Sequence, residues 1–92
     1  MSDPRTLSEQ ALTSGDIADL LRVGVPVHLQ NCSFIGVDCA EADLAEWRFE
    51  KCDLRRANLD HCILEDVVVS GCRSVETSFR FARFSQVSFK NN

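Results

Sequence analysis

Apolar residues in positions 27–92 recur with a period of five residues. Each repeat has two such positions, a central one and another two residues before it. These two series hold 24 apolar residues in 26 positions, whereas the other 39 positions of residues 27–91 hold only seven. The central series is Leu29, Phe34, Cys39, Leu44, Phe49, Leu54, Leu59, Leu64, Val69, Ser74, Phe79, Phe84 and Phe89.

A period of five excludes the two simplest chain conformations. An α-helix turns by about 100° per residue, so these positions would be spread around its whole circumference. A flat strand alternates its faces at every residue and would keep phase only within one repeat. Both series point inward only if the chain bends between repeats, and four bends close a square coil. The pattern therefore predicts an all-β solenoid whose coils stack at about 4.8 Å.

Three of the pentapeptides resemble a known family. Residues 42–46, 52–56 and 57–61 read Ala-Asp-Leu-Ala-Glu, Cys-Asp-Leu-Arg-Arg and Ala-Asn-Leu-Asp-His. Pentapeptide-repeat proteins have a small residue, Asp or Asn, Leu or Phe, and then two variable positions. The resemblance covers residues 27–91 and implies a right-handed quadrilateral β-helix of about three coils. Trp47 at a small-residue position and Ser74 at a central position depart from the motif.

The segment before the repeats is expected to form a short helical cap. Thr6 and Glu9 have the capping-box spacing that favours a helix over residues 7–13. Ser14 is placed to cap a second helix over residues 16–23, which Gly24 would end. Because the open end of a solenoid exposes apolar side chains and strand edges, it needs a cover. We therefore divide the chain into a helical N-terminal cap, residues 1–26, and a repeat domain, residues 27–92.

No comparable cover follows the last repeat in this sequence. The pattern places four apolar side chains on the exposed end of the last coil, namely Phe79, Phe84, Val87 and Phe89. Members of the family that this chain resembles form homodimers through their C-terminal coils, and the same is expected here. A further domain would cover this end instead if the sequence is a fragment. A second candidate surface for a partner consists of the outward apolar residues Ile63, Val68, Val75 and Phe81.

Stacked coils bring residues that are 20 apart in sequence side by side. The predicted charge pairs are Asp53 with Arg73, Arg56 with Glu76, and Asp60 with Arg80. All five cysteines fall on inward positions, with Cys32, Cys52 and Cys72 in one column. The coil spacing exceeds the Cβ separation of about 3.5–4.5 Å that a disulfide needs, so we expect free thiols.

No pattern typical of catalysis or of cofactor binding is found. Nucleophile-elbow, phosphate-loop, zinc-protease and EF-hand motifs do not occur, and the cysteines do not converge on one point as metal ligands would. The basic aromatic stretch at residues 79–84 leaves only Phe81 free to stack on a base, which argues against nucleic-acid binding. Neither a signal peptide nor a segment long enough to span a bilayer is present, so we expect a cytoplasmic protein that does not engage membranes.

These observations favour a non-enzymatic protein–protein interaction or scaffold module with an unidentified protein partner and without a cofactor or metal. The resemblance implies two alternatives. One is a DNA mimic that modulates a type II topoisomerase such as gyrase, although Arg55, Arg56, Arg80 and Arg83 interrupt the acidic surface of this chain, whose net charge is −4. The other is the recognition domain of a bacterial effector.

Overall fold

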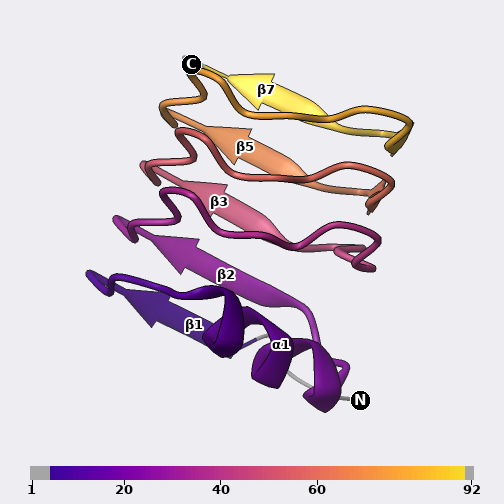
Figure 1. The fold of residues 1–92 in the computed structure, drawn as a ribbon. Coiled ribbons are helices and arrows are strands. Elements are labelled where there is room, and N and C mark those ends of the chain that lie inside the picture. The colour runs from indigo at the N-terminus through magenta and orange to yellow at the C-terminus, as the bar shows by residue number, and fades with distance from the viewer. Residues whose placement is uncertain (1–4, 91–92) are drawn as a thin grey trace.

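The computed structural model describes residues 5–90, in which short parallel strands stack along one axis (Figure 1). One sheet has the strand order β1-β2-β3-β5-β7, and β4 pairs with β6 in a second sheet. The strands are β1 (Arg5–Ser8), β2 (Val27–Gln30), β3 (Arg48–Glu50), β4 (Ile63–Glu65), β5 (Val68–Ser70), β6 (Arg83–Ser85) and β7 (Ser88–Lys90), and the helix is α1 (Ser14–Val23).

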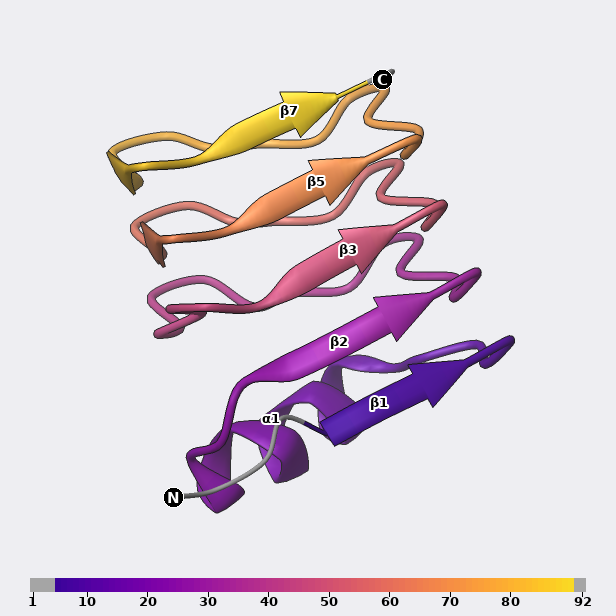
Figure 2. The same ribbon diagram turned by 180° about the vertical axis from the view of Figure 1, so that it is seen from behind.

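The register of the strands repeats with every fourth pentapeptide. His28 pairs with Arg48, Arg48 with Val68, and Val68 with Ser88, all in parallel. Three further parallel ladders have the same offset and pass through residues 33, 53 and 73, residues 38, 58 and 78, and residues 43, 63 and 83. The chain thus visits four ladders before it returns to the first, and Figure 2 shows the successive passes lying one above another. This is the offset that the five-residue period predicts.

The corners between ladders explain the Asp or Asn of the motif. The Asp43 carboxylate accepts a hydrogen bond from the Ala45 N–H (3.1 Å), and Asn58 accepts one from the Asp60 N–H (3.0 Å). Each of these side chains closes a turn that is followed by a residue with positive φ, such as Glu46 (66°). Since this backbone region is uncommon for residues other than glycine, the side-chain hydrogen bond stabilises a bend that the chain would otherwise seldom adopt.

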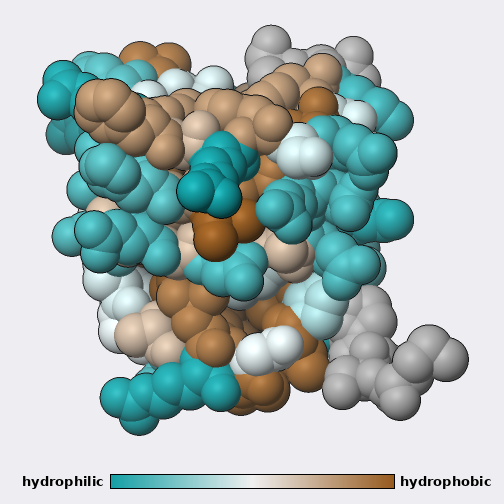
Figure 3. Space-filling view, turned by 90° about the vertical axis from the view of Figure 1, so that its right-hand side faces the viewer, coloured by the Kyte–Doolittle hydropathy of each residue, from teal (hydrophilic) through white to brown (hydrophobic). Residues whose placement is uncertain are grey.

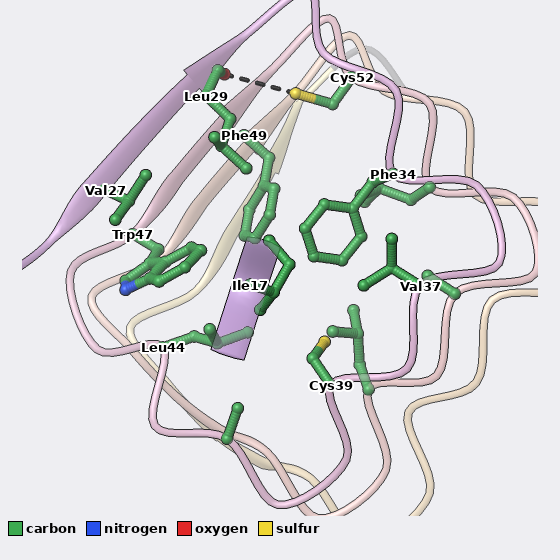
Figure 4. Close-up of a cluster of buried hydrophobic side chains, with 14 of the residues drawn as sticks. Ile17, Val27, Leu29, Phe34, Val37, Cys39, Leu44, Trp47, Phe49 and Cys52 are labelled. Carbon is green, nitrogen blue, oxygen red and sulfur yellow. Dashed lines mark hydrogen bonds between the residues drawn. The ribbon is translucent and has the colours of Figure 1, made fainter. Parts of the chain in front are cut away.

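The inward positions form one continuous core. Phe34 and Phe49 meet edge to face with ring centroids 5.6 Å apart, and Trp47 lies 6.1 Å from Phe49 (Figure 4). No polar or charged residue among residues 5–90 is buried. The buried apolar side chains reach from Leu12 to Cys72 and include every repeat centre from Leu29 to Val69. Side chains therefore fill the interior of the solenoid.

The prediction of a helix over residues 7–13 is wrong. Arg5–Ser8 is strand β1, in which Leu7 pairs with Leu29 of β2, and Ala11 bridges to Ser33. Leu7 packs against the core and Leu12 is buried in it, so these two leucines, one pentapeptide apart, extend the repeat pattern toward the N-terminus. Pairing with the edge of β2 gives this segment sheet hydrogen bonds and apolar burial together, which outweighs the capping-box spacing of Thr6 and Glu9.

The second predicted helix is present as α1 and begins two residues earlier than expected. Thr13, not Ser14, is its N-cap, in a capping box with Asp16, and Gly24 ends it in the left-handed conformation (φ 76°). Ile17 is 1 % exposed and belongs to the same buried cluster as Phe34 and Phe49 (Figure 4). The Ser14 hydroxyl accepts a hydrogen bond from the Asp38 N–H (2.9 Å). Helix α1 therefore contributes both apolar and polar contacts at the N-terminal end of the stack.

Candidate functional site

The last described coil, which contains β7, lies at the end of the stack opposite α1 (Figure 1). Three phenylalanine rings form a triangle in this coil. The ring centroids are 5.9 Å apart for Phe79 and Phe84, 6.2 Å for Phe79 and Phe89, and 6.3 Å for Phe84 and Phe89. Phe79 and Val87 pack against the core, whereas Phe84 and Phe89 are 51 % and 50 % exposed. We call Phe79, Phe84, Val87 and Phe89 the aromatic end.

The register explains why Phe84 and Phe89 are exposed although they occupy inward positions of the repeat. Leu64 pairs with Phe84 across β4 and β6, and Leu64 is buried because β6 covers it. Within residues 5–90, no further strand pairs with β6 or β7 on their far side. The apolar face and the strand edges are therefore exposed together, a combination typical of surfaces where another chain pairs or packs.

The second candidate surface is not brought together. Ile63 and Val68 are half-buried and lie on different ladders, while Val75 and Phe81 are 63 % and 81 % exposed and follow two other ladders. The Phe81 ring instead stacks on His61, with centroids 5.2 Å apart and an interplanar angle of 20°. The four residues therefore do not form one patch.

The predicted charge pairs are neighbours, but only one makes an ion pair. Arg56 and Glu76 lie 3.8 Å apart, as predicted. Asp53 is paired with Arg73 across the ladder, yet its carboxylate binds Arg55 at 2.7 Å. The hydrogen bond from Arg55 lowers the pKa of Asp53. The prediction paired only residues that are 20 apart in sequence, so it did not include Arg55, which lies in the same turn as Asp53.

Asp60 is held by the next coil through hydrogen bonds and not through the Arg80 guanidinium. Its carboxylate accepts hydrogen bonds from the Ser78 hydroxyl and from the Arg80 N–H (2.9 Å). The hydrogen bond from Ser78, followed by that from Arg80, lowers the pKa of Asp60. The contact joins adjacent coils on the outside of the solenoid.

The five cysteines are buried as free thiols, as predicted. The thiols of Cys52 and Cys72 donate to carbonyl oxygens one coil earlier, Leu29 at 3.4 Å and Phe49 at 3.3 Å. The hydrogen bond with Cys72, together with burial, raises the pKa of Cys52. No three His, Cys, Asp or Glu side chains in the described part of the chain are arranged to hold a metal ion. Over the same residues, no helix has the length and apolar character needed to cross a membrane.

Comparison with protein-family models matches the family of pentapeptide repeats. The match counts 8 copies and covers residues 32–71 and 52–91. It includes the residues of the aromatic end and most of the segment in which each ladder recurs once per coil. Comparison with curated proteins gave no match. Since the matched residues are more than half of the chain, this protein belongs to the pentapeptide-repeat family.

Proposed function

We propose that this protein is a non-enzymatic interaction module that forms a homodimer through its aromatic end. Pentapeptide-repeat proteins are generally interaction modules without catalytic activity, and buried apolar side chains fill the core over the described residues of this chain. The scaffold of the proposal is a right-handed quadrilateral β-helix of about three coils, capped at its N-terminal end by α1. Its place of action is the cytoplasm, where reducing conditions suit five free thiols.

The observation that carries the proposal is the exposure of the phenylalanine triangle. Phe84 and Phe89 leave half of their surface in water although both occupy repeat centres. A second copy related by a two-fold axis would place the same rings against each other, because an isologous interface joins identical patches. Burial of apolar surface contributes roughly 25 cal/mol per Å², so two exposed rings from each copy supply a substantial part of the driving force.

The test is the mass of the full chain in solution. Light scattering coupled to size exclusion, over a concentration series, should give twice the chain mass of 10.3 kDa at high concentration. A mass of one chain at every concentration up to the millimolar range would overturn the proposal.

A further inference from the structure

A groove with a volume of about 470 Å³ lies at the N-terminal end, between the end of α1 and residues 41–47. We call it the N-terminal groove. Its apolar lining comes mainly from Leu20, Leu21, Val25, Pro26 and Trp47, and three carboxylates stand along it, those of Glu41, Asp43 and Glu46. Figure 3 views the side on which β2 begins, and at the level of α1 it shows apolar surface flanked by hydrophilic side chains.

The backbone beside the groove is the N-terminal edge of the ladder through residues 43, 63 and 83, and no bridge joins Asp43 to another described residue on that side. One coil later, the Ile63 N–H donates to the Ala42 carbonyl at 2.9 Å. On the two preceding ladders, the corresponding N–H groups have acceptors on the N-terminal side. The Ser33 N–H donates to the Gln10 carbonyl (2.8 Å), and the Asp38 N–H donates to the Ser14 hydroxyl (2.9 Å). The Asp43 N–H has no partner among residues 5–90.

Two carbonyl groups on the same edge are open as well. In the next coil, the carbonyls of Ile63 and Glu65 accept from residues 44 and 46 at 2.9 and 2.8 Å. The corresponding carbonyls of Asp43 and Ala45 accept no hydrogen bond from the described residues. The residue in register with the Ala45 carbonyl is Pro26, which has no N–H to donate. One donor and two acceptors on residues that line the groove are therefore open.

Trp47 adds a side-chain donor. It is only 2 % exposed, it lines the groove, and its Nε1–H makes no hydrogen bond to residues 5–90. No fully buried side-chain nitrogen or oxygen in that range lacks a partner, so Nε1 borders open space. Figure 4 shows this nitrogen on the side of the ring away from Phe49 and Ile17. The indole N–H is thus an accessible donor on an otherwise buried side chain, and an occupant of the groove can accept its hydrogen bond.

We propose that the N-terminal groove binds a short extended segment of a partner protein, with basic residues alternating with apolar ones, as an added β-strand. An extended chain supplies the carbonyl that the Asp43 N–H needs and the N–H groups that the Asp43 and Ala45 carbonyls need. Its apolar side chains face Leu20 and Trp47, and its basic side chains face the carboxylates of Glu41, Asp43 and Glu46.

Charge complementarity selects the basic occupant. In the described chain, Glu41, Asp43 and Glu46 form no ion pair with a Lys or Arg side chain. Arg22 stands in the last turn of α1 but is not part of the groove lining. A strand that brings two or three cations to this edge gains attraction, whereas an acidic strand meets like charges.

The probe is a capped five-residue peptide, Lys-Val-Lys-Val-Lys, added to the full chain. Trp47 is the one tryptophan of the sequence, so its fluorescence reports on the groove directly. We expect a saturable shift of Trp47 emission and, in NMR spectra, downfield shifts of the Trp47 indole and Asp43 amide protons. The same peptide with N-methylated valines lacks N–H donors for the carbonyls and should bind at least about tenfold more weakly.

The matched protein variants are Glu46→Lys and Asp66→Lys. The two positions occupy the same corner on successive coils, and both have positive φ, so the substitutions are structurally equivalent. Glu46→Lys should weaken peptide binding about tenfold, whereas Asp66→Lys, outside the groove, should change it less than about twofold.

Three outcomes would overturn the proposal. These are no Trp47 response at millimolar peptide, equal binding of the acidic peptide Glu-Val-Glu-Val-Glu, and a Trp47 shift that grows with protein concentration without peptide, which would assign the groove to a second copy of the chain. The proposal is independent of the aromatic end. A monomeric Phe89→Asp variant should therefore bind the basic peptide with unchanged affinity.

Discussion

Phe89 lies next to Val69 in the β5–β7 ladder, yet Val69 is 5 % exposed and Phe89 is 50 % exposed. The two residues occupy the same inward column of the repeat. The difference arises because β7 covers Val69, and no described strand covers Phe89 on its far side. Burial in this fold thus depends on the following coil, and the last described coil leaves its apolar column in solvent.

Phe89→Asp should convert the proposed dimer to a monomer. In the dimer, a carboxylate at this position would lose its water and face the same carboxylate of the second copy. The free-energy cost of burying these two like charges exceeds the free energy gained by burying the phenylalanine rings. Light scattering should then give the mass of one chain at concentrations where the wild-type protein gives two. Phe81→Asp is the matched control, because Phe81 is 81 % exposed and lies outside the aromatic end, so this variant should remain dimeric. A dimeric Phe89→Asp protein would place the interface elsewhere.

The proposed dimer should become tighter as salt is raised. Residues 73–92 contain four basic residues and one acidic residue, and Arg83 and Lys90 directly adjoin Phe84 and Phe89. A two-fold interface brings these cations together with their copies, and salt screens that repulsion, with a Debye length of about 30 Å at 0.01 M and about 10 Å at 0.1 M. Sedimentation should show the dissociation constant falling over this range. Lys90→Gln should reduce the dependence, and a dissociation constant that rises with salt would contradict the arrangement.

Leu54→Ala should lower the free energy of unfolding by about 2–5 kcal/mol. Leu54 is 1 % exposed, and an interior already filled by its neighbours on adjacent coils can collapse only partly around the cavity. Urea unfolding followed by circular dichroism measures the change. Val75→Ala is the control, since Val75 is 63 % exposed and its truncation should change stability by less than about 0.5 kcal/mol. Equal effects at the two positions would show that Leu54 does not lie in the core.

The sequence predicts the stacked part of the fold well because each repeat meets a copy of itself. The alternation of two apolar positions in every pentapeptide assigns Phe34, Leu44 and Leu54 to the core without knowledge of any long-range contact, and all three are buried. The prediction fails before residue 14. There, Leu7 pairs with Leu29, whereas a spacing of four pentapeptides would place it beside Val27, so this segment falls outside the phase of the repeats.

Of the two candidate sites, one could be predicted from the sequence and the other could not. The aromatic end follows from the period alone, because Phe79, Phe84 and Phe89 continue inward columns. The N-terminal groove does not follow from it, since it depends on where α1 ends relative to residues 41–47. The sequence signal for the groove is Pro26: in this fold the N–H of a residue donates to the carbonyl 19 residues later, and Pro26 has no N–H for the Ala45 carbonyl.

All five thiols should be unreactive in the folded protein. Each cysteine is at most 5 % exposed, and a thiol reacts only where the reagent can reach its sulfur, so burial protects all five. A thiol-specific colorimetric reagent at pH 8 should therefore titrate none of the cysteines in native buffer and all five in denaturant. The rate of reaction in native buffer should equal the rate of unfolding or opening. Rapid stoichiometric labelling of one thiol without denaturant would contradict the filled core.

Acidification should destabilise the fold through Asp60. Hydrogen bonds from the Ser78 hydroxyl and the Arg80 N–H stabilise the charged carboxylate, so its pKa in the folded protein is lower than the ordinary value of 3.8. The unfolded chain therefore binds the proton more readily, and this contribution to stability is present above pH 3.8 and is lost as the pH falls through the folded pKa. The midpoint of urea unfolding, measured between about pH 5 and pH 2, should fall less steeply for Ser78→Ala than for the wild type, because that variant removes the main donor to Asp60. Identical slopes would show that the contact between Asp60 and the next coil does not contribute to the pH dependence.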